Sequence, residues 1–105
     1  MATLKPGHWN LAQDIKSISR VFTCRNFKAA VDFINRAAEV AERADIQHHP
    51  DLHLTQYRDV VVTCWTHAAE GLTQYDFKLA RALDSVGVDY SPKWLKARPE
   101  VHPST

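Results

Sequence analysis

The sequence is poor in cysteine and has no long apolar run. Cys24 and Cys64 are its two cysteines in 105 residues, too few for a disulfide framework, and we expect reduced thiols in an intracellular protein. No apolar stretch approaches the roughly 20 residues that cross a bilayer. The first ten residues, MATLKPGHWN, lack the apolar segment of a secretory signal. We therefore expect no membrane contact and a cytoplasmic location, with the nucleus as the alternative.

The chain also lacks an excess of charge of one sign. Lys and Arg number 13 and Asp and Glu number 12, which gives a formal net charge of +1. No block of five or six like charges occurs, so we expect no direct binding to nucleic acid. Gly7, Gly71 and Gly87 are the only glycines and lie far apart, which excludes a glycine-rich phosphate loop.

What is present is the composition of one globular domain. Apolar residues make up 45% and charged residues 24% of the chain, close to globular averages. A chain of this length buries roughly 65% of the surface of its unfolded form, so folding needs neither a disulfide nor a metal. We expect a single domain over 1–105, with an irregular tail from about 89 that packs through Tyr90 and Trp94.

Two segments have the apolar spacing of helices. In the first, 25–44, Asn26 is a suitable N-cap. In the second, 73–87, Thr73 is a suitable N-cap and Gly87 a left-handed C-terminal residue. The expected buried stripes are Phe27, Ala30, Val31, Ile34, Ala38 and Ala41 in the first helix and Leu79, Ala80, Leu83 and Val86 in the second.

Three segments have the composition of strands: 16–24, 51–57 and 59–67. The last two follow each other so closely that we expect a hairpin with its turn near 55–59. The predicted fold is α+β, a small antiparallel sheet of about four strands with two or three helices packed on one face. Open edges of such a sheet favour pairing with another subunit.

Histidines gather around this hairpin. His48 and His49 are adjacent and precede Pro50 just before the first strand, while His67 ends the second. In an antiparallel hairpin these two ends are neighbours, and counting outward from a turn at 57 or 58 places His67 opposite 48–50. We therefore expect His48, His49 and His67 at one end of the sheet. The alternative is that they are ordinary surface residues.

Two further questions are whether the histidines bind a metal and what role Asp76 has. Three imidazoles could ligate zinc, but adjacent side chains diverge and no Cys-x-x-Cys or His-Glu-x-x-His spacing occurs, so we expect no metal. Asp76, three residues after Thr73, fits half of a capping box. It could equally grip an NH-rich ligand.

One set of spaced residues resembles the pterin-4a-carbinolamine dehydratase family. The pattern is His-His-Pro, an aromatic residue, Thr-His, and an Asp nine positions later. Its members here are His48, His49, Pro50, Tyr57, Thr66, His67 and Asp76, with a matching Gly-Leu-Thr at 71–73. The resemblance covers roughly residues 9–90. At the position four before the first histidine the family often has an acid; this chain has Ala44, and Glu42 or Asp45 could replace that acid.

The resemblance implies an activity and its residues. The activity is removal of water from 4a-hydroxytetrahydrobiopterin to give quinonoid dihydropterin, in tetrahydrobiopterin recycling, without cofactor. His49 and His67 would form the acid and base pair, and His48 would orient the substrate or share the proton. Pro50, Trp65, Thr66 and Asp76 would contact the pterin.

The resemblance also implies partners. We expect a homodimer or homotetramer. The alternative function is that of a protein-binding module, a dimerisation cofactor or coactivator of a homeodomain transcription regulator.

Overall fold

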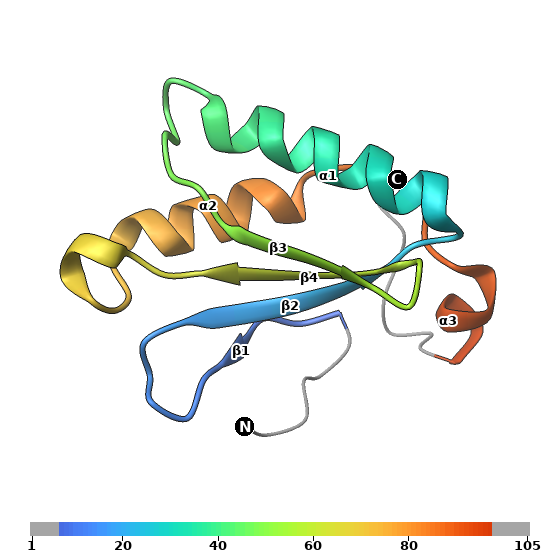
Figure 1. The fold of residues 1–105 in the computed structure, drawn as a ribbon, viewed down its shortest axis with the longest axis horizontal. Helices are drawn as coiled ribbons and strands as arrows, with labels where there is room; N and C mark the ends of the chain where they lie inside the picture. The colour runs from blue at the N-terminus through green and yellow to red at the C-terminus, as the bar shows by residue number, and fades with distance from the viewer. Residues whose placement is uncertain (1–6, 98–105) are drawn as a thin grey trace.

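The computed structural model describes residues 7–97 and places an antiparallel sheet beneath two helices (Figure 1). The sheet has four strands in the order β1-β2-β4-β3, which confirms the predicted α+β class. The elements are β1 (Asn10–Leu11), β2 (Ile18–Thr23), α1 (Phe27–Glu42), β3 (Asp51–Thr55), β4 (Asp59–Cys64), the 3₁₀ helix η1 (His67–Ala69), α2 (Gln74–Asp84) and α3 (Pro92–Ala97). Within 7–97, no helix is both long enough and apolar enough to cross a bilayer.

The predicted hairpin is confirmed. Thr55 pairs with Asp59 across a turn at 56–58, and the pairing continues to Asp51 and Thr63. Gln56 and Tyr57 take the left-handed conformation, with φ of 50° and 56°, which closes the turn. β4 then lies between β3 and β2, so its alternate side chains are buried against the helices.

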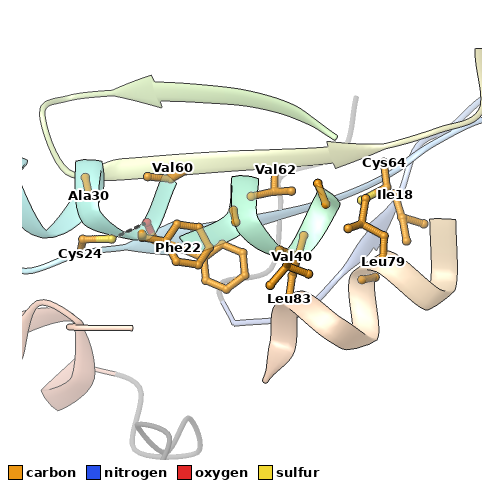
Figure 2. Packing of buried hydrophobic residues seen from close by; sticks show 14 of the residues in the cluster. Ile18, Phe22, Cys24, Ala30, Val40, Val60, Val62, Cys64, Leu79 and Leu83 are labelled. Carbon is orange, nitrogen blue, oxygen red and sulfur yellow. Dashed lines mark hydrogen bonds between the residues drawn. The ribbon is translucent and has the colours of Figure 1, made fainter. Parts of the chain in front are cut away.

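The core lies between the sheet and the two long helices (Figure 2). Phe22 of β2 meets Phe33 of α1 with ring centroids 4.5 Å apart. Val60 and Val62 of β4 are fully buried in the same layer. Burial of each such side chain stabilises the fold by roughly 1.5–3 kcal/mol, so this layer holds the sheet against both helices.

The first helix has the predicted cap but a rotated buried face. Asn26 accepts a hydrogen bond from the Ala29 amide at 2.9 Å, as predicted. Phe27, expected in the core, is 56% exposed, and Ala38 is also exposed. The buried side chains are Ala30, Phe33, Ala37, Val40 and Ala41. The apolar residues span more than one face of the helix, and the contact with Phe22 selects the face that carries Phe33.

The C-terminal predictions need two corrections. Gly87 is not left-handed, since Gly7 is the one described glycine with positive φ; α2 ends at Asp84, and the Ser85 amide caps it by donating to Ala82 and Leu83. The tail is not irregular throughout, because α3 covers Pro92–Ala97. Tyr90 and Trp94 do pack as expected, with stacked rings 5.1 Å apart. Residues 98–105 of the predicted tail lie outside the described part of the chain.

The strand at 16–24 begins at Ile18 rather than Lys16. Its partner β1 was not predicted, because two residues carry no periodicity. Trp9, just before β1, is half-buried. Its ring meets the edge of Phe22 at 6.5 Å.

Candidate active site

The candidate residues lie where β3 begins, β4 ends and α2 begins, at the left end of the sheet in Figure 1. The local sequence explains this meeting point. Thr73 caps α2, with its side chain accepting from the Tyr75 amide at 3.3 Å. A bridge between Thr66 and Gly71 turns the chain from β4 into the helix. The first turn of α2 is thereby brought beside the residues that follow β4.

Asp76 is the centre of the site and is fully buried. Its Oδ2 accepts from the Thr73 amide at 2.9 Å and from the Thr66 hydroxyl at 2.7 Å. The Thr66 and Thr73 hydroxyl oxygens are 2.8 Å apart. A buried carboxylate needs such donors because ionised oxygens only accept. The capping box predicted for Asp76 is therefore complete, and one carboxylate oxygen is left for another partner.

That partner is His48. Its Nε2 lies 2.6 Å from Asp76 Oδ1, and the imidazole is largely buried, with 16% of the side chain exposed. Its ring also faces Tyr75 at 6.1 Å. Because an ionised carboxylate oxygen only accepts, the contact is a hydrogen bond in which Nε2 is the donor. Asp76 therefore caps α2, as the sequence predicts, and also holds a histidine through its second oxygen. Its contact with an NH-rich ligand stays a prediction.

His49 turns to a different acid. Its Nε2 lies 2.9 Å from Glu42 Oε1, and both side chains are about two-thirds exposed. Asp45, the other acid considered for this place, instead pairs with Arg43 at 2.8 Å. Adjacent histidines thus diverge as expected, each with Nε2 beside a carboxylate and Nδ1 free of partners among residues 7–97.

His67 is placed differently from the prediction. β4 ends at Cys64, and His67 begins η1 instead of ending the strand. The predicted pairing of His67 with 48–50 is wrong, because the ladder stops at Asp51 and Thr63 while Thr66 bridges to Gly71. The two segments are still neighbours, since Thr66 Oγ1 lies 3.5 Å from His48 Nε2.

Trp65 supports the His67 ring. The two ring centroids are 4.0 Å apart, and the indole Nε1 donates to Asp51 Oδ2 at 3.1 Å. His67 is exposed, and its imidazole has no hydrogen-bond partner in the described part of the chain. The Trp65 ring therefore packs against the imidazole at an angle of 46° and leaves both imidazole nitrogens available to a ligand.

The structure brings some of the predicted residues together and leaves others apart. His48, Thr66 and Asp76 form one hydrogen-bonded group. Next to it the rings of Trp65 and His67 pack in a tilted contact, and His49 faces Glu42. Pro50 is half-buried between the adjacent histidines and β3. Glu42 was one of the two acids considered for the place beside the histidines, and it is the one that contacts His49. Three other contacting residues were not predicted as part of the site: Asp51, Thr73 and Tyr75. The capping pattern could have identified Thr73, whereas Asp51 has no local signal.

A metal centre has no support in this arrangement. Among residues 7–97, no group of three or more His, Cys, Asp and Glu side chains is arranged to hold an ion. A hollow of about 370 Å³ between β1 and α2 is lined by Trp9, Leu11, Ile18, Phe77, Ala80, Arg81 and Asp84. It includes none of the histidines, so we base the site on the side-chain contacts instead.

Comparisons with known proteins agree with the resemblance seen in the sequence. The family model described as pterin 4 alpha carbinolamine dehydratase matches residues 1–86. The Arabidopsis thaliana protein named pterin-4-alpha-carbinolamine dehydratase 2, mitochondrial, is 38% identical over 87 residues, which are 81% of this chain and 46% of that protein; this chain thus spans about half of that relative. A Sinorhizobium fredii protein with the same family name is 42% identical over 88 residues, 84% of this chain and 81% of that protein.

Two solved structures are also similar. One, titled transcriptional coactivator/pterin dehydratase from Brucella melitensis, has a TM-score of 0.65 and 33% identity and covers 75% of this chain and 81% of that one. The other is titled a pterin dehydratase-like protein identified as a RuBisCO assembly factor in the alpha-carboxysome. Its TM-score is 0.59 over 74% of this chain and 88% of that one. At 15% identity it is similar in fold alone.

Proposed function

The chain belongs to the pterin-4α-carbinolamine dehydratase family, and on that premise we propose that it removes water from 4a-hydroxytetrahydrobiopterin by histidine acid and base catalysis. Its role would be the recycling of tetrahydrobiopterin. The observation that carries the proposal is the group around buried Asp76, which holds His48 beside the segment that presents His67. A fully buried carboxyl group that contacts a histidine as well as the helix amides exceeds what a helix cap requires.

The reaction needs one proton given and one taken. The substrate carries a hydroxyl on carbon C4a and a hydrogen on the adjoining nitrogen N5. An imidazolium protonates the hydroxyl, the C–O bond breaks, and water leaves as the N5 lone pair forms the C4a=N5 double bond. A neutral imidazole then takes the N5 proton, which gives the quinonoid dihydropterin. Each proton transfer of this kind contributes typically 10²–10⁴-fold.

The contacts support a division of labour. His67 has both ring nitrogens available and His49 has Nδ1, so these two are proposed as the acid and base pair. His48 is held by Asp76 and would position the substrate or share its proton. Pro50, Trp65 and Thr66 are proposed to contact the pterin with Asp76 behind them, and no metal is assigned a step.

The test is turnover of the carbinolamine followed by absorbance. His67→Ala and His49→Ala should each lower kcat about 100-fold or more. His53→Ala is the matched control because His53 is exposed on the middle of β3, and it should change kcat less than twofold. Dialysis against a chelator should leave turnover unchanged. Small and equal effects from all three substitutions would remove the proposal.

A second role is suggested by the Brucella melitensis structure, whose title names a transcriptional coactivator. We propose that this chain can also bind a transcription regulator of the homeodomain class as a dimerisation cofactor. Large exposed apolar side chains, Leu11, Ile15, Tyr75 and Phe77, are available for such contacts. A pull-down with the regulator's dimerisation segment tests this role. Binding by a catalytically dead His67→Ala chain would show that the two roles are separate, and no binding would remove the second.

Self-association is proposed on the sheet edges. β1 and β3 are the outer strands, and an unpaired strand edge readily pairs with another copy. A homodimer or homotetramer would give a light-scattering mass two or four times the 11.9 kDa of the chain. A mass of one chain at micromolar concentration would contradict this proposal.

The two cysteines are free and buried, as expected in a reducing compartment. We therefore retain the cytoplasm as the proposed location, with the nucleus as the alternative. The Arabidopsis relative is named as mitochondrial, so cell fractionation should include that compartment. Recovery of the chain with mitochondria would overturn the proposed location.

A further inference from the structure

A hollow of about 240 Å³ lies beside the candidate site. It is lined by Asp14, Lys16, Ser17, Thr63 and Trp65. The first three belong to the loop between β1 and β2, and Thr63 is near the end of β4. Figure 1 shows this blue loop and the yellow η1 segment at the same left end of the sheet. The dehydratase chemistry proposed above does not use the polar residues of this loop.

Trp65 connects the hollow to the proposed chemistry. Its indole lines the hollow and also contacts the His67 ring, with the two ring centroids 4.0 Å apart. The hydrogen bond from its Nε1 to Asp51 fixes the indole in place. A ligand group in the hollow is therefore separated from His67 by the width of a single aromatic side chain.

The hollow is preformed by internal hydrogen bonds of the loop. The Ala12 amide donates to the Ser17 carbonyl at 3.0 Å, and the Lys16 amide donates to Asp14 Oδ1 at 3.0 Å. These bonds leave the Lys16 ammonium and the second Asp14 oxygen free to meet a ligand. A preformed site costs little ordering on binding.

On the side formed by the sheet, a threonine hydroxyl lines the hollow. Thr63 Oγ1 and Ser19 Oγ are 2.9 Å apart and share one hydrogen bond. A hydroxyl has one donor and two acceptor positions, and the contact with buried Ser19, which does not line the hollow, uses one position of Thr63. Thr63 therefore keeps hydrogen-bonding capacity for a ligand. With the ammonium and the carboxylate the hollow offers both donors and acceptors, and its two charges cancel. Such a lining favours a neutral hydroxylated group over an anion.

We propose that this hollow binds the hydroxylated side chain that a pterin carries at C6, and that Lys16 and Thr63 determine substrate preference. The inference rests on the proposed function. C6 is two bonds from C4a, through N5, so a side chain leaving the ring there starts next to the reacting atoms. With the ring at His67, the side chain crosses the edge of Trp65 and reaches the hydroxyl and ammonium groups of the hollow.

The experiment compares two substrates that differ only at C6, where one carries 1,2-dihydroxypropyl and the other methyl. The intact protein should show a kcat/KM about tenfold higher for the hydroxylated substrate, since each neutral hydrogen bond gained supplies roughly three- to tenfold. Lys16→Met and Thr63→Val should each reduce this ratio three- to tenfold, mainly through KM. Calorimetric binding of the matching 7,8-dihydropterins should show the same preference without any turnover.

The controls repeat each substitution away from the hollow. Lys28→Met on α1 and Thr55→Val at the opposite end of the sheet should leave the substrate ratio within twofold. Equal kcat/KM for the two substrates, or a ratio unchanged by both test substitutions, would overturn the inference while the dehydratase proposal stood. Absence of turnover together with a side-chain preference in binding would instead overturn the proposed reaction and retain the hollow as a ligand site.

Discussion

At the scale of single residues, Asp76 explains most of the site. One carboxylate caps α2 through the Thr73 amide, accepts from Thr66 and meets His48 at 2.6 Å. Local sequence predicts the first of these contacts, because a capping box spans four consecutive residues. The contact with His48 joins residues 28 apart and depends on the packing of α2 against the sheet. Spacing alone therefore left the role of Asp76 open, and the three-dimensional arrangement shows the cap together with the contact to His48.

Asp76→Asn should destabilise the protein and impair the site. The amide would turn an NH₂ group toward donors, leaving buried groups unpaired at a cost of about 2 kcal/mol, and His48 would lose its acceptor. Urea unfolding should show that loss, and kcat should fall together with it. Glu39→Gln, on the exposed side of α1, is the control and should change neither. Wild-type stability in Asp76→Asn would argue against a charged, hydrogen-bonded carboxylate.

The buried thiols provide a prediction about pH. Burial, with smaller effects of nearby carboxylates, raises the pKa of Cys24 to about 11 and that of Cys64 to about 12, from 9.0. Between these values and about pH 9, the unfolded chain releases thiol protons that the folded chain keeps. The free energy of unfolding should therefore fall above pH 9, by at most about 1.4 kcal/mol per pH unit for each thiol. Below pH 9 both thiols are protonated in the folded and in the unfolded chain, so they cause no change of stability with pH there.

Urea unfolding between pH 7 and 10.5 would measure that slope. Cys64→Ala should be less stable at neutral pH because of the lost packing, yet its stability should decline less steeply above pH 9. The same lysines and tyrosines are present in the wild-type protein and in Cys64→Ala, so their effect on the slope cancels when the two proteins are compared. Parallel curves for the two chains would contradict the raised pKa of Cys64.

At the scale of elements, local signals and tertiary packing can be separated. The caps of α1 and α2 were predictable because Asn26 and Thr73 act on amides within three residues. The buried face of α1 was not, since alanine and large apolar residues occur around much of the helix and only the position of Phe22 selects one side. Likewise η1 interrupts the strand expected to reach His67 because the Thr66–Gly71 bridge competes with further pairing to β3.

Two phenylalanines on α1 test this assignment of its buried face. Phe33 is 1% exposed and Phe27 is 56% exposed. Phe33→Ala should lower the free energy of unfolding by about 3–5 kcal/mol, whereas Phe27→Ala should cost less than about 1 kcal/mol. Phe33→Leu, with a smaller expected loss, keeps the test usable if Phe33→Ala does not fold. A larger loss from Phe27→Ala than from Phe33→Ala would restore the face predicted from sequence.

At the scale of the whole molecule, the fold separates stability from chemistry. The core fills the space between the sheet and the helices (Figure 2), while the histidines occupy the end of the sheet where loops meet α2. The antiparallel hairpin makes this possible by returning β4 to the segment where β3 begins. The order of elements in the sequence predicts that the end of β4 and the start of β3 lie side by side. The direction of each imidazole does not, because partners such as Glu42 and Asp51 come from separate segments.

The most direct test of the account is a crystal structure of the protein with a bound 7,8-dihydropterin. The account predicts the bicyclic ring against His67, with N5 within hydrogen-bonding distance of an imidazole from His49 or His67, and the C6 substituent directed past Trp65. A pterin bound in the hollow between β1 and α2, with no contact to His49 or His67, would contradict the account.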